Sequence, residues 1–179
     1  PITEVIDFEK TLTKMKSEQN LRHVLNRHEE GRDNWKKKNP DYEKNLEIAK
    51  EWFEVFVTED MEATAAFYAD EVEYQSAFYG GPIMNRAETI EYLQGWQDNM
   101  ENIAWEAEQW LPGADPETGL PNGSVRTYGY WSGTHSVSGK SFRGLWYHYL
   151  TFDENGKIIN GGDFGDATGL VMAVAPDQE

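Results

Sequence analysis

The chain has 179 residues, which is enough for one domain with its own hydrophobic core and one additional element. Its 32 acidic and 16 basic residues give a formal net charge of −16, so we expect no nucleic-acid and no membrane partner. The absence of cysteine excludes disulfide scaffolds, thiolate zinc sites and cysteine nucleophiles. Since we find no apolar run of about 18 residues and no signal peptide at the start, the expected location is cytoplasmic.

Helical periodicity of the apolar residues predicts a first helix over residues 1–30, which Gly31 would end. A polar linker follows at residues 36–40. The same periodicity predicts a second helix over 41–58 and a short one over 60–67. We therefore divide the chain into an N-terminal helical extension, residues 1–40, and a main domain, residues 41–179.

The pattern then becomes strand-like. After a predicted turn at 69–71, Val72, Tyr74 and Ser76 alternate with polar residues. Asn85 and Glu88 resemble a capping box and predict the start of a helix. The apolar side of that helix would carry Ile90, Leu93, Trp96 and Met100.

Four more strands complete the predicted sheet. They are expected over residues 102–111, 124–137, 140–152 and 157–164, with a loop at 112–123 and a short closing segment at 166–174. Helices gathered at one end of such a sheet indicate the α+β class. We expect a strongly curved, mixed or antiparallel sheet that forms a cone, with the helices packed on its concave face.

The last hairpin brings a histidine and an aspartate together. Asn155-Gly156 is a strong local hairpin signal, and as a two-residue turn it places His148 directly opposite Asp163. A four-residue loop makes the two residues diagonal neighbours on one face, whereas a three-residue loop puts them on opposite faces. The pair therefore shares a face if the loop has an even number of residues.

Aromatic residues and glycines alternate on the face that carries His148. With residues 138–139 as the preceding turn, Gly129 would lie opposite His148 and Trp131 opposite Trp146. Bulky rings beside glycines leave hollows, so we expect a pocket with Trp131 and Trp146 in its walls. This pocket is the predicted site for a small-molecule ligand.

The opposite face of the same strand is also rich in aromatic residues. Such a surface is not expected to face only water. We predict that it forms a homodimer interface through Arg143, Leu145, Tyr147 and Tyr149.

A histidine beside a carboxylate in an apolar pocket can transfer protons, and the alternative is a structural ion pair between His148 and Asp163. No metal site is expected, because His135 would lie too far along the sheet to share an ion with this pair. No cofactor is expected either.

Trp52 and Phe56 lie one helical turn apart and are candidates for the pocket roof, with core packing as the alternative.

Two stretches of the chain resemble a known family. Residues 67–74 (FYADEVEY) are similar to the helix-to-strand passage of the nuclear transport factor 2-like superfamily. Residues 156–159 (GKII) and 163–170 (DFGDATGL) are similar to the last strand and the tail of its SnoaL-like polyketide cyclase branch. The order and spacing of these motifs extend the resemblance over about residues 42–174.

The resemblance implies roles for four residues. Asp163 falls where many SnoaL-like members carry an acidic residue that acts as acid and base, and His148 falls where ketosteroid isomerases carry an oxyanion-hole acid. Tyr74 and Ser76 fall on the pocket side of the first strand, and Ser76 replaces the isomerase general base. A serine cannot do that work unaided at neutral pH, so steroid isomerisation is not expected.

The leading functional hypothesis is a cofactor-independent acid/base enzyme of the cyclase, isomerase or dehydratase type. Its substrate would be small and apolar or aromatic. Asp163 would be the acid/base, with His148 as its partner or as an oxyanion donor, and Tyr74 and Ser76 would orient the substrate. The alternatives are a non-catalytic small-molecule binding protein of the same fold and a dimerisation or interaction module.

Overall fold

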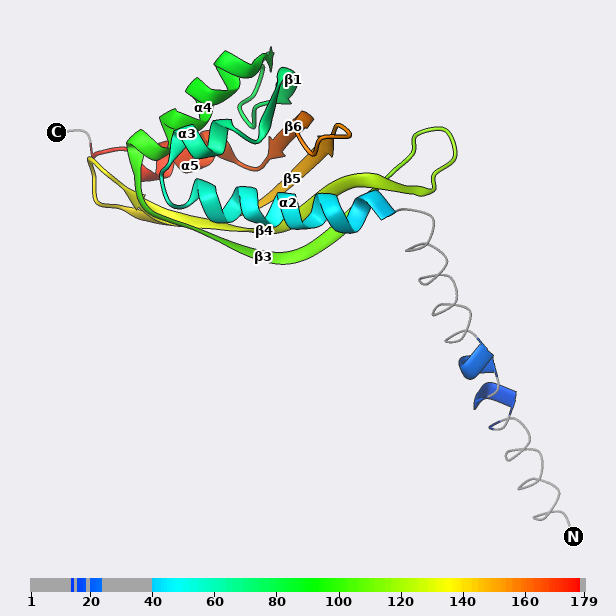
Figure 1. Ribbon diagram of the computed structural model, residues 1–179. Coiled ribbons are helices and arrows are strands. Elements are labelled where there is room, and N and C mark those ends of the chain that lie inside the picture. Colours follow the sequence, from blue (N-terminus) through cyan, green and yellow to red (C-terminus); the bar gives the residue numbers. More distant parts are fainter. Residues whose placement is uncertain (1–13, 15, 19, 24–39, 178–179) are drawn as a thin grey trace, which may run out of the picture. The chain divides into compact units, whose positions relative to one another are not determined.

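The computed structural model describes residues 14, 16–18, 20–23 and 40–177 (Figure 1). The chain divides into two units, residues 1–40 and 41–179, and each is described by itself. In the first unit, all the described residues up to 23 are helical. The rest of the helix predicted over 1–30, and the linker at 36–39, lie outside the described residues.

From residue 40 on, helices and strands follow the predicted order, with the short strand β2 as an addition. In sequence they are α2 (Pro40–Phe56), α3 (Met61–Ala65), β1 (Tyr68–Gln75), β2 (Ile83–Met84), α4 (Arg86–Asn99), β3 (Met100–Ala114), β4 (Pro121–His135), β5 (Ser141–Phe152), β6 (Ile158–Phe164) and α5 (Ala167–Val174). Asp60 caps α3, and Asn85 with Glu88 forms the predicted capping box of α4. Asp166 caps α5, since its side chain accepts a hydrogen bond from the backbone N–H of Gly169.

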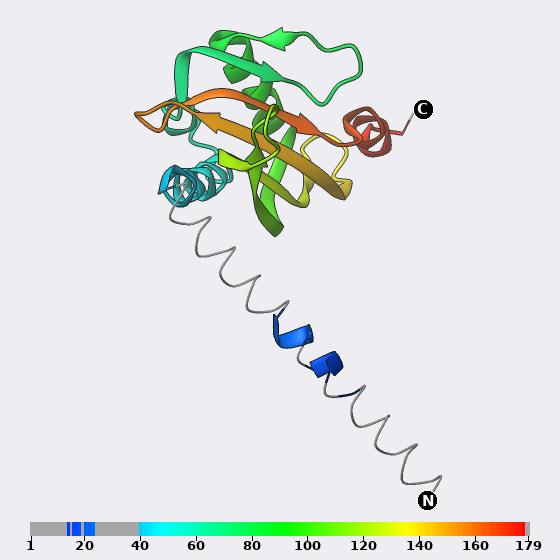
Figure 2. The same ribbon diagram turned by 90° about the vertical axis from the view of Figure 1, so that its right-hand side faces the viewer.

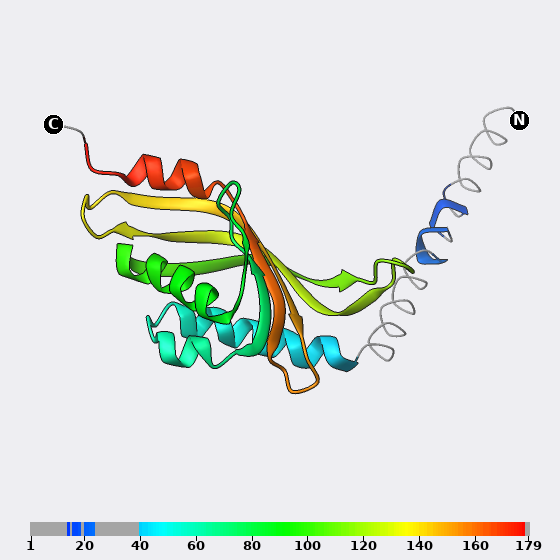
Figure 3. The same ribbon diagram turned by 90° about the horizontal axis from the view of Figure 1, so that it is seen from above.

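The strands form one six-stranded mixed sheet in the order β2-β1-β6-β5-β4-β3. Among the described strands, only β1 and β6 pair in parallel, and Figure 2 shows them side by side in the same direction. The sheet is strongly curved, and α2 and α4 lie on its concave side (Figure 3). The predicted α+β cone is confirmed.

The β5–β6 hairpin confirms that His148 lies directly opposite Asp163, although the loop differs from the prediction. Phe152 pairs with Ile158, so residues 153–157 form an odd loop, and Thr151 then pairs with Asn160. The unpaired Ile159 is a β-bulge that shifts the register by one residue. The bulge therefore offsets the odd loop and returns the pair to one face.

The predicted register of the β4–β5 hairpin is wrong by two residues. The backbone N–H of His135 bonds to the carbonyl of Lys140, so residues 136–139 form the loop. Thr127, in place of Gly129, is opposite His148, and Gly144 is opposite Trp131. A shift of two keeps every side chain on its predicted face.

Two predicted loops are shorter than expected. The turn expected at residues 69–71 is absent. These residues belong to β1, which starts at Tyr68 and runs beside β6. β3 continues to Ala114 and β4 begins at Pro121. Pro112 is tolerated within β3 because this strand is at the edge of the sheet.

Aromatic packing joins α2 to the concave face. Phe53 stacks on Trp105 and Trp131 at ring-centroid distances of 4.7 and 5.6 Å, and its ring meets His148 edge-on at 5.1 Å. Burial of these rings fixes the helix above the strands that carry the candidate site. Among the described helices, we find none long and apolar enough to cross a membrane.

Candidate functional site

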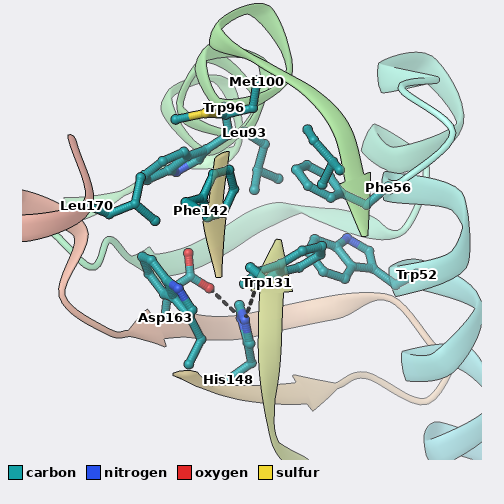
Figure 4. A pocket seen from close by; sticks show the side chains of 12 residues that line it. Trp52, Phe56, Leu93, Trp96, Met100, Trp131, Phe142, His148, Asp163 and Leu170 are labelled. Atoms are coloured by element: carbon teal, nitrogen blue, oxygen red, sulfur yellow. Dashed lines mark hydrogen bonds and ion pairs between the residues drawn. The ribbon is translucent and has the colours of Figure 1, made fainter. Parts of the chain in front are cut away.

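A cavity of about 50 Å³ lies between the concave face and the helices, and its walls are mainly aromatic (Figure 4). Asp163 and His148 are its polar groups. The apolar lining consists of Trp52, Phe56, Leu93, Trp96, Met100, Ile103, Trp131, Phe142, Trp146 and Leu170. We call this space the inner cavity.

Asp163 is only 5% exposed, and three donors surround its carboxylate. The Tyr74 hydroxyl donates to Oδ1 over 2.5 Å, and the Tyr92 hydroxyl donates to Oδ2 over 3.0 Å. Nδ1 of His148 lies 2.6 Å from Oδ1, in a bent contact without the geometry of a regular hydrogen bond. Within the described part of the chain, no lysine or arginine forms an ion pair with this carboxylate. Neutral donors therefore compensate for its burial.

The other nitrogen of His148 is occupied by Trp131. The indole Nε1–H of Trp131 donates to His148 Nε2 over 2.8 Å. An indole N–H can only donate, so Nε2 accepts and the neutral ring carries its proton on Nδ1, facing Asp163. This arrangement fixes both the tautomer and the orientation of the imidazole, with Nε2 bound by Trp131 and Nδ1 facing Asp163.

Burial raises the pKa of Tyr74 well above the usual tyrosine range, and the negative charge of Asp163 adds to this effect. The pKa of Tyr92 is raised for the same two reasons, burial first. Both hydroxyls therefore keep their protons at ordinary pH. Tyr74 and Tyr92 act as permanent hydrogen-bond donors to the carboxylate.

The glycines on this face do not leave the hollows that we expected. A Cβ on Gly129 would lie 2.7 Å from the ring of Trp105, and one on Gly161 would lie 2.9 Å from the ring of Tyr74. Neighbouring rings therefore fill the space above these glycines. This explains a cavity well below the several hundred Å³ of ordinary ligand pockets.

The structure brings most of the predicted site residues together. Those that line the inner cavity are Trp52, Phe56, Trp131, Trp146, His148 and Asp163. Tyr74 reaches the site through its hydrogen bond to Asp163. Ser76 lies beyond the end of β1 and is not part of the lining, because its hydroxyl is directed at the backbone of Gly81.

Sequence reasoning missed Tyr92. This residue stands on α4, one turn before Trp96, which belongs to the apolar side predicted for that helix. The periodicity identified the helix and its side correctly. The periodicity could not show that this side of α4 faces Asp163, because Tyr92 and Asp163 are 71 positions apart in sequence.

The convex face of the sheet carries a second aromatic cluster. Tyr147 contacts Tyr128 and Phe164 at ring-centroid distances of 4.9 and 5.8 Å. Leu145 is 53% exposed and Phe164 is 52% exposed. This surface contains the residues predicted for a dimer interface.

No group of three or more histidine, aspartate or glutamate side chains converges within the described residues. His135 hydrogen-bonds to Ser138, in the loop of the β4–β5 hairpin, and His148 pairs with Asp163. The polar chemistry of the inner cavity is therefore that of Asp163 and the groups that donate to it.

A family model for the SnoaL-like domain matches residues 49–160. No curated protein sequence matches the chain. Among solved structures, an NTF2-like protein from Burkholderia thailandensis is 20% identical, with 74% of this chain and 98% of that chain covered at a TM-score of 0.56. A protein with a ketosteroid isomerase-like fold from Catenulispora acidiphila is 13% identical, with 73% and 94% covered at a TM-score of 0.59. The pinacolase BvnE from Penicillium brevicompactum is 16% identical, with 73% and 92% covered at a TM-score of 0.59.

Proposed function

The chain belongs to the SnoaL-like domain family, and we propose that it is a cofactor-independent acid/base enzyme of the cyclase, isomerase or dehydratase type. The observation that carries the proposal is a carboxylate, Asp163, that is buried in an aromatic cavity and surrounded by neutral donors. A carboxylate of this kind is poised to take a proton from a carbon acid and to return it.

In this proposal Asp163 is the only group that exchanges a proton with the substrate. His148 is a positioning residue, because Trp131 occupies its Nε2 and its Nδ1 faces Asp163. Tyr74 and Tyr92 hold the carboxylate in place through their hydroxyl groups. The surrounding rings exclude water and favour a small apolar or aromatic substrate.

The size of the inner cavity limits the substrate. About 50 Å³ has room for a few water molecules or a small reactive group, and not for a whole polycyclic molecule. The reacting part of the substrate is therefore small, or the substrate displaces side chains such as Trp96 when it binds. The same small cavity favours the second candidate function, a binding protein that holds a small apolar ligand without transforming it.

Proton abstraction next to a carbonyl is a step that cyclase, isomerase and dehydratase reactions share, so it can be assayed before the natural substrate is identified. We would incubate the protein with small cyclic and aromatic ketones in D₂O and follow exchange at the α-carbon by NMR. The expected result is exchange by the wild type and a loss of at least 100-fold in Asp163→Asn, which keeps the shape and removes the base. Asp166→Asn, which changes the cap of α5 outside the carboxylate network, is the matched control.

Equal exchange rates in the wild type and Asp163→Asn would rule out the catalytic role of Asp163. A ketone that binds to the wild type without any exchange would instead favour the binding protein. Trp131→Phe is a further test: it should lower the turnover rate in the wild type by misplacing His148, and by much less in a His148→Phe background, whereas an equal fall in both would show that Trp131 acts only as part of the cavity wall.

We also propose that two copies of the chain associate through the convex aromatic cluster. The proposed interface contains Arg143, Leu145, Tyr147 and Tyr149. It combines exposed apolar and aromatic side chains with Arg126 and Arg143, of which Arg143 pairs with Glu106, and an exposed surface of this kind favours association. Sedimentation velocity should give a dimer for the wild type and a monomer for Leu145→Asp. Val137→Asp, at a 76% exposed position in the β4–β5 loop, is the control. A monomeric wild type would refute the proposal.

A further inference from the structure

A groove of about 590 Å³ lies next to the inner cavity, between α4 and the segment formed by α5 and the residues that follow it. Both helices can be followed in Figure 3. The size of the groove is typical of sites that hold small molecules, whereas the inner cavity is far smaller. Trp96 and Met100 line both spaces and form the wall between them.

One stripe of α4 forms a long side of the groove. The stripe consists of Glu88, Glu91, Tyr92, Gly95, Trp96 and Asn99, which follow each other at helical spacing. Its ends are eleven residues apart, which corresponds to about 16 Å along the helix axis. The opposite side is apolar and includes Val171 and Val174. The groove therefore fits an elongated apolar molecule.

Gly95 marks the middle of this stripe. Glycine destabilises a helix interior relative to alanine, so its presence there needs a reason. Packing within the protein does not provide one, because a Cβ at this position would meet no atom within 4 Å among the described residues. The missing side chain keeps the groove open at its centre, as a bound molecule would require.

The two ends of the groove differ in polarity. Glu88 and Glu91 lie at one end, and Asn99 and His135 lie at the other. The backbone N–H of Ser138 donates to Nδ1 of His135 over 3.2 Å, so the neutral ring carries its proton on Nε2. One end thus carries two carboxylates, the other offers the Nε2–H of His135 as a donor, and the described lining contains no lysine or arginine.

We infer that this groove binds an elongated apolar molecule that carries an amine at the end near Glu88 and Glu91. The inference goes beyond the proposed function, because it rests on Gly95 and the groove and not on the chemistry of Asp163. A protonated amine complements Glu91 and the remaining oxygen of Glu88, whose other oxygen accepts the backbone N–H of Asn85, whereas a carboxylate or phosphate on the same molecule would be repelled. Because both glutamates are exposed, an ion pair with either contributes little binding energy. Their charge therefore determines which head group is preferred, and the apolar contact provides most of the affinity.

Dodecylamine, dodecanol and dodecanoate share one chain and differ in head-group charge, so they serve as probes. Calorimetric titration below their aggregation limits should rank the amine first and the carboxylate last. Glu91→Gln should weaken amine binding by about twofold to fivefold and leave the alcohol unchanged. Glu71→Gln, on β1 and outside the groove, is the charge-matched control.

Gly95 provides the decisive variants. Gly95→Ala should raise the melting temperature by roughly 2–4 °C and still weaken dodecanol binding. Gly95→Leu should weaken it by at least tenfold, whereas Gln94→Leu on the neighbouring face of α4 should bind like the wild type. Leucine is a better helix former than glycine, so these proteins should fold.

Dodecanol binding that is unchanged in Gly95→Leu, or that is equally lost in Gln94→Leu, would overturn the inference. A preference for dodecanoate would overturn the assignment of an amine. Dodecanol binding that persists in Asp163→Asn would support a separate site in the groove. This result would hold even if the exchange assay with the same variant ruled out the proposed role of Asp163.

Discussion

Replacing Tyr74 by phenylalanine tests how strongly the protein depends on the bonds that hold Asp163. The ring of Tyr74 remains, and only the hydroxyl that donates to Asp163 over 2.5 Å is lost. Both residues are buried, so water cannot replace the donor easily. A hydrogen bond to a charged group contributes about 1.5–3 kcal/mol, and we expect Tyr74→Phe to lose that much unfolding free energy at neutral pH.

The assay is urea unfolding followed by circular dichroism. With a slope of about 1–3 kcal/mol per molar urea, the midpoint should fall by roughly 1 M. Tyr68→Phe is the matched control, because the Tyr68 side chain is also buried but its hydroxyl forms no regular hydrogen bond. That control should leave the unfolding free energy unchanged or raise it, because it removes a buried hydroxyl that has no regular hydrogen bond. If the two variants unfold at the same urea concentration, the hydroxyl of Tyr74 does not stabilise Asp163 and the reasoning fails.

Two further predictions concern pH and packing. Burial and the charge of Asp163 raise the pKa of Tyr74 and Tyr92 in the folded state. The two groups therefore contribute stability that is complete below the unfolded tyrosine pKa of about 10, and this stability is lost as the pH rises above that value. Tyrosinate absorbance should therefore show both groups ionising only as the protein unfolds; ionisation in the folded state near pH 10 would contradict this. Gly165→Ala should destabilise the protein by about 1–3 kcal/mol and alter tryptophan fluorescence, since its Cβ would lie 2.5 Å from the ring of Trp146. An unchanged melting temperature would show that this ring can move freely.

Local patterns predicted the α+β cone and the shared face of the central pair, but not the details of the hairpins. Asn155-Gly156 indicated a turn, and the face of each residue follows from the period of two. The β4–β5 register was missed because its loop is held from outside. Ser138 donates to the carbonyl of Val174, and Lys140 pairs with Asp177, both more than 30 residues away. No local rule contains such contacts.

The volume of the inner cavity could not be predicted from the sequence either. Glycines beside large rings indicate where space exists, but not which ring fills it. The ring over Gly129 comes from Trp105 on β3, and the ring over Gly161 comes from Tyr74 on β1. Both come from other strands, so filling depends on the assembled sheet. For the same reason the sequence did not indicate that Tyr92 belongs to the site.

The Ile159 bulge gives β6 a way to keep the orientation of Asp163 when the loop before it changes by one residue. A single-residue deletion within residues 153–157 would ordinarily turn the rest of β6 over and move the carboxylate to the convex face. Here the strand can absorb that deletion by losing the bulge, and an insertion by gaining another. The carboxylate can thus stay on the concave face when this loop loses or gains one residue, although Gly156 itself is constrained, since its Cβ would lie 2.6 Å from Ile48 of α2.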